Sequence, residues 1–149
     1  FAQVSAIDIS QPALEVAREN AKMPKTRVNF ECRDALSLSP KRGEKYDIIV
    51  SNPPYIADSE RKDMERSVLD YEPSSALFVP DDDALRFYRA IAEWGKAVLV
   101  PGGYIYYEIN PLFVQEMVSM MTGLGYNDIE IIEDMQARNR MLCAHLPKV

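Results

Sequence analysis

Apolar positions recur along this chain in two spacings, and the alternation between them predicts an α/β fold. Short apolar runs, typical of buried strands, are separated by segments whose apolar residues recur every three to four positions, as on one face of a helix. Strands that alternate with helices indicate a doubly wound sheet, whose right-handed crossovers place helices on both faces. The predicted strands are 4–9, 27–33, 46–51, 104–109, 127–133 and 139–146, and the predicted helices are 11–22, 84–98 and 113–124.

The last two predicted strands change this picture, because only a short turn separates them. That turn includes Gln136, Ala137 and Arg138. Two strands joined so closely must run antiparallel. We therefore expect a largely parallel sheet that ends in a reversed edge strand.

Length and composition place the chain among ordinary globular domains. Its 149 residues are enough for one domain with a real core. Hydrophobic residues make up 47% and charged residues 27%, which is typical of soluble proteins. The net charge of -6 argues against a nonspecific nucleic-acid surface, which needs clustered lysine and arginine.

Cysteine and histidine add little chemistry. Cys32 and Cys143 form no disulfide framework and have no metal-ligand spacing, so we expect both to be buried. The single histidine, His145, is predicted to be a strand residue rather than a catalyst. No apolar run approaches the ~18 residues of a membrane span, and no signal peptide is visible, so a cytoplasmic location is expected.

The most informative stretch is Asn52-Pro53-Pro54-Tyr55, which directly follows the predicted strand 46–51. Proline cannot donate to a strand ladder, and a residue before proline is driven out of the α region. The four residues should therefore form a turn at the carboxyl end of a strand, where ligands bind in open α/β sheets.

This turn could orient a planar amino group for reaction. The lone pair of such a nitrogen is delocalised, but the Asn52 side-chain oxygen and the Pro53 carbonyl could accept its two hydrogens and aim it at a methyl donor. Tyr55 could stack on the planar substrate. The alternative is a strand-ending turn with a packed tyrosine.

Two further acids follow predicted strands. Asp8 ends the strand 4–9, where a carboxylate could bind a ribose diol through two charge-assisted hydrogen bonds. Asp34 follows the strand 27–33. The alternatives are a helix-start acid for Asp8 and a loop cap for Asp34.

Residues 56–83 form an unusually long connection beside the turn, with a short helix expected near 59–67. Long connections in compact domains are usually functional or mobile, so we expect an insertion that faces the substrate. Residues 81–83 are three consecutive aspartates, which are expected to cap the next helix rather than bind a metal.

The motifs as a set resemble the HemK/PrmC family of protein-glutamine methyltransferases, over nearly the whole chain. The resemblance is carried by the turn at 52–55, by Tyr71-Glu72-Pro73 and Ala76-Leu77, and by Pro101-Gly102-Gly103-Tyr104. It implies a Rossmann-like class I fold that uses S-adenosylmethionine to methylate the glutamine in the Gly-Gly-Gln segment of class-1 peptide chain release factors. It also implies catalytic roles for Asn52, Pro53 and Tyr55, cofactor binding by Asp8, Ile9, Asp34, Ala35 and Asn52, and substrate binding by Pro54, Tyr55, Tyr71 and Glu72.

One part of the family pattern is absent. The resembled enzymes carry a glycine-rich loop after their first strand, whereas this sequence has no glycine before Gly43. The chain therefore resembles a carboxyl-terminal catalytic fragment that lacks the first strand. We expect such a fragment to be inactive by itself and its exposed sheet edges to favour homo-oligomers.

Two other functions remain open at this point. The same turn chemistry serves enzymes that methylate the amino group of adenine in DNA or RNA, although the acidic charge disfavours them. A non-catalytic binding fragment is the third reading.

Overall fold

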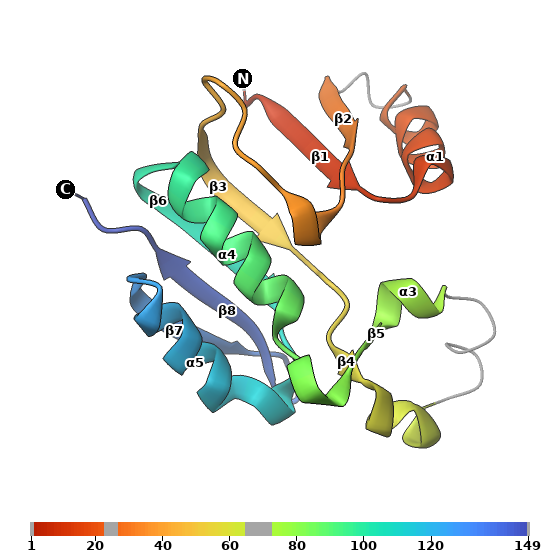
Figure 1. Cartoon of the computed structure of the whole chain (residues 1–149), viewed down its shortest axis with the longest axis vertical. Helices are drawn as coiled ribbons and strands as arrows, with labels where there is room; N and C mark the ends of the chain where they lie inside the picture. The colour runs from red at the N-terminus through yellow and green to blue at the C-terminus, as the bar shows by residue number, and fades with distance from the viewer. Residues whose placement is uncertain (1, 23–26, 65–72, 149) are drawn as a thin grey trace. The chain divides into compact units, whose positions relative to one another are not determined.

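The structure is a computed structural model that describes residues 2–22, 27–64 and 73–148. The chain forms two compact units, Phe1–Ser39 and Pro40–Val149, which we call the amino-terminal and carboxyl-terminal units (Figure 1). Each unit has its own strands.

The amino-terminal unit is a single β-α-β element. Strand β1 (Val4–Asp8) and strand β2 (Val28–Cys32) pair in parallel, and helix α1 (Gln11–Lys22) connects them. The helix begins where the sequence predicts, because the Ala13 amide donates to the Ser10 hydroxyl at 3.3 Å, which is an N-cap hydrogen bond.

The carboxyl-terminal unit holds a four-stranded mixed sheet. The strand order is β3 (Tyr46–Ser51), β6 (Leu99–Glu108), β8 (Asn139–His145) and β7 (Asn127–Glu133). Strands β3 and β6 are parallel, whereas β8 runs antiparallel to both of its neighbours. The predicted antiparallel hairpin is therefore observed, but the reversed strand β8 lies between β6 and β7, so that β7 and not the reversed strand forms the edge.

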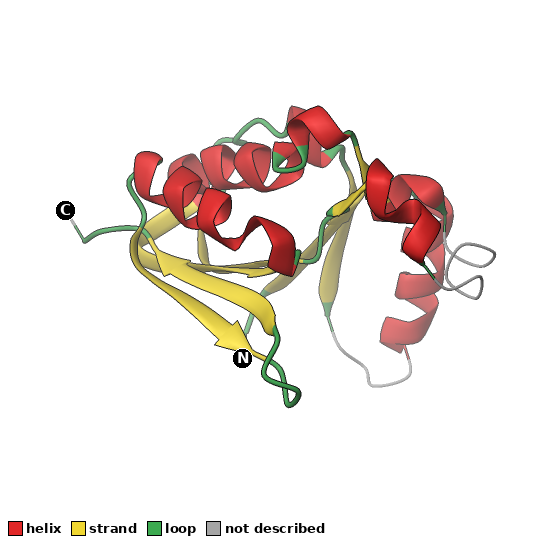
Figure 2. Ribbon diagram, turned by 90° about the horizontal axis from the view of Figure 1, so that it is seen from below, coloured by secondary structure: helices red, strands yellow, loops and turns green. Residues whose placement is uncertain are grey.

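Two helices, α4 (Arg86–Val98) and α5 (Val114–Gly123), lie on one face of this sheet (Figure 2). The strand side chains follow the alternation of a sheet with one covered face. Ile49 is 8% exposed under the helices, whereas Ile48 and Val50 are 56% and 76% exposed on the opposite face. Within this unit, the described helices cover one face only.

Three buried tyrosines fasten α4 to the sheet and to the chain before β7. The Tyr107 hydroxyl donates to the Tyr88 carbonyl at 3.1 Å, and the Tyr88 hydroxyl donates to the Glu108 carbonyl at 2.9 Å. The Tyr126 hydroxyl donates to the Ala92 carbonyl at 2.8 Å. Burial raises the pKa of all three tyrosines above its ordinary value, so the hydroxyls remain neutral donors.

A glycine makes the last of these contacts fit. A Cβ atom on Gly95 would lie 2.6 Å from the Tyr126 hydroxyl oxygen and 3.5 Å from the Cδ1 atom of Ile49. Glycine has a poorer helix propensity than every other residue except proline. Helix α4 nevertheless carries glycine at position 95, because a larger residue would collide with the Tyr126 side chain.

One strand begins earlier than the sequence predicts. The predicted strand 104–109 starts at Leu99 in β6, so the pair Gly102-Gly103 lies inside the strand. The chain does not reverse there, because the Gly102 amide donates to the Leu146 carbonyl at 2.8 Å and the register with β3 shifts nearby. The glycines therefore form an irregularity within a strand.

The long connection after β3 contains more structure than predicted. Strands β4 (Ile56–Ala57) and β5 (Phe78–Val79) pair in parallel, and the 3-10 helix η2 spans Asp58–Asp63. A short helix α3 (Ser74–Leu77) precedes β5. The predicted helix near 59–67 is thus partly observed, and its last residues lie outside the described part.

The expectation that both cysteines are buried is wrong for one of them. Cys143 is buried in β8, whereas Cys32 is exposed at the end of β2. The Cys32 thiol lies 3.4 Å from the Ile9 carbonyl oxygen, at the edge where both strands of the amino-terminal unit end.

Candidate functional site

The turn Asn52–Tyr55 leaves the sheet at the carboxyl end of β3, as the sequence predicts. Asn52 is exposed and Pro53 is buried, while Pro54 and Tyr55 are half-buried. The Asn52 side chain makes no hydrogen bond within the described residues, so its amide is available to a ligand. The two prolines explain why the strand ends here, because neither has an amide hydrogen for the ladder.

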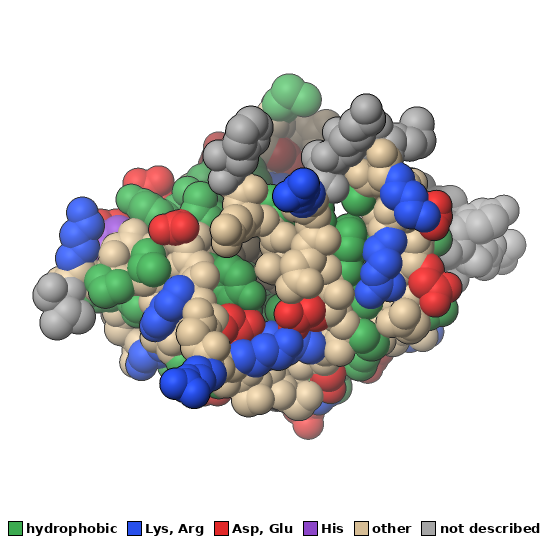
Figure 3. Space-filling model, turned by 90° about the horizontal axis from the view of Figure 1, so that it is seen from above, with side chains coloured by type: hydrophobic (Ala, Val, Ile, Leu, Met, Phe, Trp, Pro, Cys, Tyr) green, Lys and Arg blue, Asp and Glu red, His purple; other side chains and the backbone are tan. Residues whose placement is uncertain are grey.

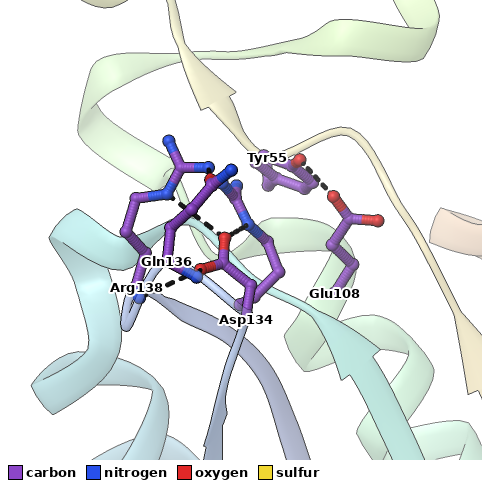
Figure 4. Close-up of polar contacts among 6 residues, drawn as sticks. Tyr55, Glu108, Asp134, Gln136 and Arg138 are labelled. Atoms are coloured by element: carbon purple, nitrogen blue, oxygen red, sulfur yellow. Dashed lines mark hydrogen bonds and ion pairs between the residues drawn. The ribbon is translucent and has the colours of Figure 1, made fainter.

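Tyr55 is held at two points by residues at the end of β6. Its hydroxyl donates to the Oε1 atom of Glu108 at 2.8 Å, as Figure 4 shows, and its carbonyl accepts from the Asn110 side chain at 3.1 Å. Burial, with a further contribution from Glu108, raises the pKa of Tyr55 to about 12. Tyr55 is therefore neutral at physiological pH.

Asn110 is a buried polar residue that joins three segments. It is 4% exposed, and its Nδ2 atom donates to the Tyr55 carbonyl and, at 2.7 Å, to Glu60 of η2. Its Oδ1 atom accepts from the Leu112 amide at 3.0 Å. Glu60 in turn accepts from the Ala57 amide at 2.8 Å. The turn and the beginning of the insertion are thus fixed to the end of β6.

Sequence reasoning missed the roles of Glu108 and Asn110. One signal was present, because Asn110-Pro111 follows a strand just as Asn52-Pro53 does. Asparagine before proline at a strand end is a local turn signal in both places. Nothing local says that the second asparagine reaches back to the first turn.

The tip of the β7–β8 hairpin brings charged residues to the same edge of the sheet. Asp134 accepts hydrogen bonds from the Gln136 and Arg138 amides, at 2.8 and 3.1 Å, and its carboxylate pairs with the Arg138 side chain (Figure 4). The same carboxylate also pairs with the Arg140 side chain. The hydrogen bond from the Arg138 amide is the main cause that lowers the pKa of Asp134 to about 2. The charge of Arg140 also lowers the pKa of Tyr55, and it thereby opposes the effects of burial and of Glu108, which raise that pKa.

The predicted cofactor residues of the amino-terminal unit lie at one edge of its two-stranded sheet. Asp8 ends β1 and pairs in register with Cys32 of β2, and Asp34 follows two residues later. Asp8 accepts from the Ser10 amide at 2.7 Å through one oxygen, and Asp34 accepts from the Leu36 amide at 2.9 Å. Asp34 therefore fills the capping role that was its alternative, whereas the Asp8 carboxylate makes a local contact just before α1.

The neighbours of these acids are placed in the same way. Ile9 is 66% exposed directly after β1, and Ala35 begins the 3-10 helix η1 (Ala35–Ser37). The predicted substrate residues Tyr71 and Glu72 lie outside the described residues. Within the described ranges, there is no group of three or more His, Cys, Asp or Glu side chains that could hold a metal ion, and no helix is long and apolar enough to cross a membrane.

Comparison with known proteins connects this arrangement to methyltransferases. A family model described as the methyltransferase small domain matches residues 1–70. A release factor glutamine methyltransferase from Bacteroides thetaiotaomicron is 47% identical over 144 residues, which cover 97% of this chain and 52% of that protein.

Solved structures agree on the fold. A methyltransferase from Pyrococcus furiosus aligns with a TM-score of 0.67 at 17% identity, covering 97% of this chain and 63% of that one. The N-methyltransferase NodS from Bradyrhizobium japonicum, in complex with S-adenosyl-L-homocysteine, aligns with a TM-score of 0.57 at 18% identity, covering 98% and 67%. The fold is therefore that of the class I methyltransferases.

The chain spans about half the length of the curated relatives it matches, with 52%, 49% and 50% coverage of the first three. Those three are 47%, 38% and 40% identical to it, and each match runs through at least 95% of this chain. Over nearly its whole length the chain is therefore similar to release factor glutamine methyltransferases, in agreement with the resemblance of its Asn-Pro-Pro-Tyr turn to the HemK/PrmC family.

Proposed function

We propose that the protein to which this chain belongs transfers a methyl group from S-adenosylmethionine to the side-chain amide nitrogen of a glutamine in a peptide chain release factor. The observation that carries the proposal is the turn Asn52–Tyr55, with its exposed amide at the carboxyl end of β3. The relatives' names support glutamine as the acceptor, and no feature of the described residues favours adenine instead.

The turn would orient the acceptor amide. The Asn52 side-chain oxygen and the Pro53 carbonyl would accept its two N–H groups, so that the nitrogen faces the methyl group rather than its own hydrogen-bond partners. The half-buried Tyr55 ring would lie against the plane of the amide, with Pro54 beside it. Catalysis would come from orientation, since an amide nitrogen cannot be made strongly nucleophilic by a nearby base.

The amino-terminal unit carries hydrogen-bond acceptors that would suit the cofactor's nucleoside part. Asp8 has one carboxylate oxygen engaged with Ser10, and its other oxygen makes no hydrogen bond within the described residues. That oxygen fits a ribose hydroxyl, with Ile9 packing alongside, while Asp34 and the Ala35 backbone fit the adenine amino group and ring. When bound, the cofactor would supply an electrophilic methyl group on a sulfonium.

The transfer balances without any further reactant. The amide nitrogen held by Asn52 and Pro53 would form its bond to the methyl carbon as the bond from that carbon to sulfur breaks, and it would then release one proton to solvent. Asn52 and Pro53 would hold the nitrogen throughout, so their contribution should be larger in the transition state than in the ground state.

The insertion 56–83 would supply further contacts to the protein substrate, including Tyr71 and Glu72. Its described beginning is fixed to the site, because Glu60 binds both Asn110 and the Ala57 amide. A release factor substrate also implies a cytoplasmic location, since these factors act in translation. Nucleic acid is not expected to bind this domain, because its net charge is -6 and Figure 3 shows basic side chains mixed with acidic ones on the face it draws.

The test is Asn52→Ala in the full-length protein, with a Gly-Gly-Gln peptide from a release factor as acceptor. We expect turnover to fall by about 10²-fold or more, while affinity for S-adenosylhomocysteine changes little, because Asn52 should act mainly on the amide and the other cofactor residues should supply most of the binding. Mass spectrometry would locate the added methyl group.

Asn127→Ala is the matched control, because Asn127 is an exposed asparagine at the start of β7 in the same unit. The control should retain turnover. Near wild-type turnover in the Asn52 variant, or a methyl group on another atom, would contradict the assignment.

A further inference from the structure

The Tyr55 phenol is bound by a carboxylate that the proposed mechanism does not use. We propose that Glu108 is a positioning residue of the methyl-transfer site. By accepting a hydrogen bond from the Tyr55 hydroxyl, Glu108 fixes the ring that lies against the acceptor amide. This inference rests on the proposed function and adds to it the residue that determines how the ring is held.

The sheet register places Glu108 beside the turn. Strands β3 and β6 run parallel and pair Ser51 with Tyr107 as their last partners, and Asn52 and Glu108 are the residues that follow this pair along the chain. The carboxylate of Glu108 therefore reaches the Tyr55 hydroxyl at 2.8 Å across neighbouring strand ends rather than from a distant loop.

Glu108 is itself held firmly. Its carbonyl accepts from the buried Tyr88 hydroxyl at 2.9 Å, and the next amide, that of Ile109, donates to the Arg140 carbonyl at 3.0 Å. The backbone is thus fixed both to α4 and to β8. Because its backbone is constrained in this way, the Glu108 carboxylate can hold the Tyr55 hydroxyl in one position.

The hydrogen bond from the Tyr55 hydroxyl fixes the orientation of the ring, which the contacts of the turn backbone do not fix. The Asn110 side chain fixes the Tyr55 carbonyl at 3.1 Å, but this contact leaves the ring free to rotate about its side-chain bonds. A hydrogen bond to a charged acceptor is stronger than one between neutral groups, so Glu108 fixes the ring orientation. Arg140 lies near enough to act on the same phenol and offsets the negative charge beside it.

The experiment uses the full-length enzyme with a Gly-Gly-Gln peptide and compares Tyr55→Phe, Glu108→Ala, Glu108→Gln and the double variant Tyr55→Phe/Glu108→Ala. Tyr55→Phe and Glu108→Ala should each lower kcat on the order of tenfold, the scale of one such hydrogen bond. Glu108→Gln keeps an acceptor oxygen and should recover most of kcat. The double variant should be no worse than either single one, because both remove the same contact.

Two measurements separate positioning from simple loss of structure. Affinity for S-adenosylhomocysteine and the thermal midpoint should be unchanged in Glu108→Gln and Tyr55→Phe. Glu93→Ala, which removes an exposed carboxylate from α4, is the matched control and should keep full kcat. Additive losses in the double variant, or a Glu108→Gln variant as impaired as Glu108→Ala, would overturn the proposal.

A further measurement does not depend on activity. In protein labelled with ¹³Cζ-tyrosine, the Tyr55 resonance, assigned by its absence from Tyr55→Phe, should shift in Glu108→Ala and stay in place in Glu93→Ala. An unshifted resonance would overturn the contact itself. A wild-type enzyme that leaves the glutamine peptide unmethylated would instead reject the proposed function, even where the resonance shifts.

Discussion

At the scale of single residues, the site is built from side chains that do two things at once. Asp8 caps the chain before α1 through the Ser10 amide and still offers an oxygen to a ligand. Asp34 likewise caps η1. Capping fixes the carboxylate before a ligand arrives, which lowers the entropy lost on binding.

This double role leads to a prediction for Asp8→Ala in the full-length protein. Affinity for S-adenosylhomocysteine should weaken by about 1.5–3 kcal/mol, the scale for hydrogen bonds to a charged group. Isothermal titration calorimetry measures it. Turnover at saturating cofactor should change much less, which is the opposite of the Asn52→Ala result.

Glu15→Ala provides the control, because Glu15 is an exposed acid on α1 in the same unit. Its affinity should equal that of the wild-type protein. If Asp8→Ala also leaves the affinity unchanged, the Asp8 carboxylate only stabilises the chain before α1 and does not bind the cofactor.

How much of the site the sequence predicts depends on how local each contact is. The Asn52–Tyr55 turn could be predicted because proline chemistry and strand periodicity are both properties of neighbouring residues. The contacts of Glu108 and Asn110 could not, because Tyr55 is 53 residues away from the first and 55 from the second. They depend on the pairing of β3 with β6, which single-sequence patterns do not specify.

At the scale of elements, α4 is the helix that the site depends on most. Tyr88, near its beginning, binds the carbonyl of Glu108, and its middle packs tightly against Ile49 and the Tyr126 hydroxyl. The helix therefore supports both the strand that leads to the turn and the strand that holds it.

The tight packing predicts an unusual effect of Gly95→Ala. Alanine is favoured over glycine in a helix by about 1 kcal/mol, but the new methyl group would lie 2.6 Å from the Tyr126 hydroxyl oxygen. The ring would have to move away from Ala92 and lose its buried hydrogen bond. The net effect should be destabilising by about 1–3 kcal/mol, the usual cost of overpacking.

Gly123→Ala is the matched substitution in α5, because a Cβ atom there would meet nothing within 4 Å. It should leave the protein unchanged or slightly more stable. The comparison is the urea concentration at the unfolding midpoint. A Gly95→Ala variant as stable as Gly123→Ala would show that the tyrosine moves at no cost.

At the scale of the whole molecule, the strand ladders are divided between the two units. Among the described strands, β1 pairs only with β2, and β3 pairs only with β6, so each has an edge without a ladder partner. Unpaired edges are templates for another strand. In the same 149 residues, no glycine precedes Gly43, so the sequence offers no glycine-rich loop to approach the methionine part of a cofactor.

The 149-residue chain by itself should therefore bind S-adenosylhomocysteine weakly and form oligomers through its strand edges. Titration calorimetry measures the first property, and light scattering over a range of concentrations measures the second. Micromolar binding by a monomer would contradict both expectations together, and would mean that Asp8 and Asp34 suffice to hold the ligand.

The division into two units also decides what optical spectroscopy can detect. The only tryptophan and all eight tyrosines occur at or after residue 46, so they belong to the carboxyl-terminal unit. Tryptophan emission and the near-ultraviolet signals of these rings therefore report on that unit alone, whereas far-ultraviolet circular dichroism includes α1 and its two strands as well. Coincident transitions would mean that the two units melt cooperatively, and separate transitions would give each unit a stability of its own.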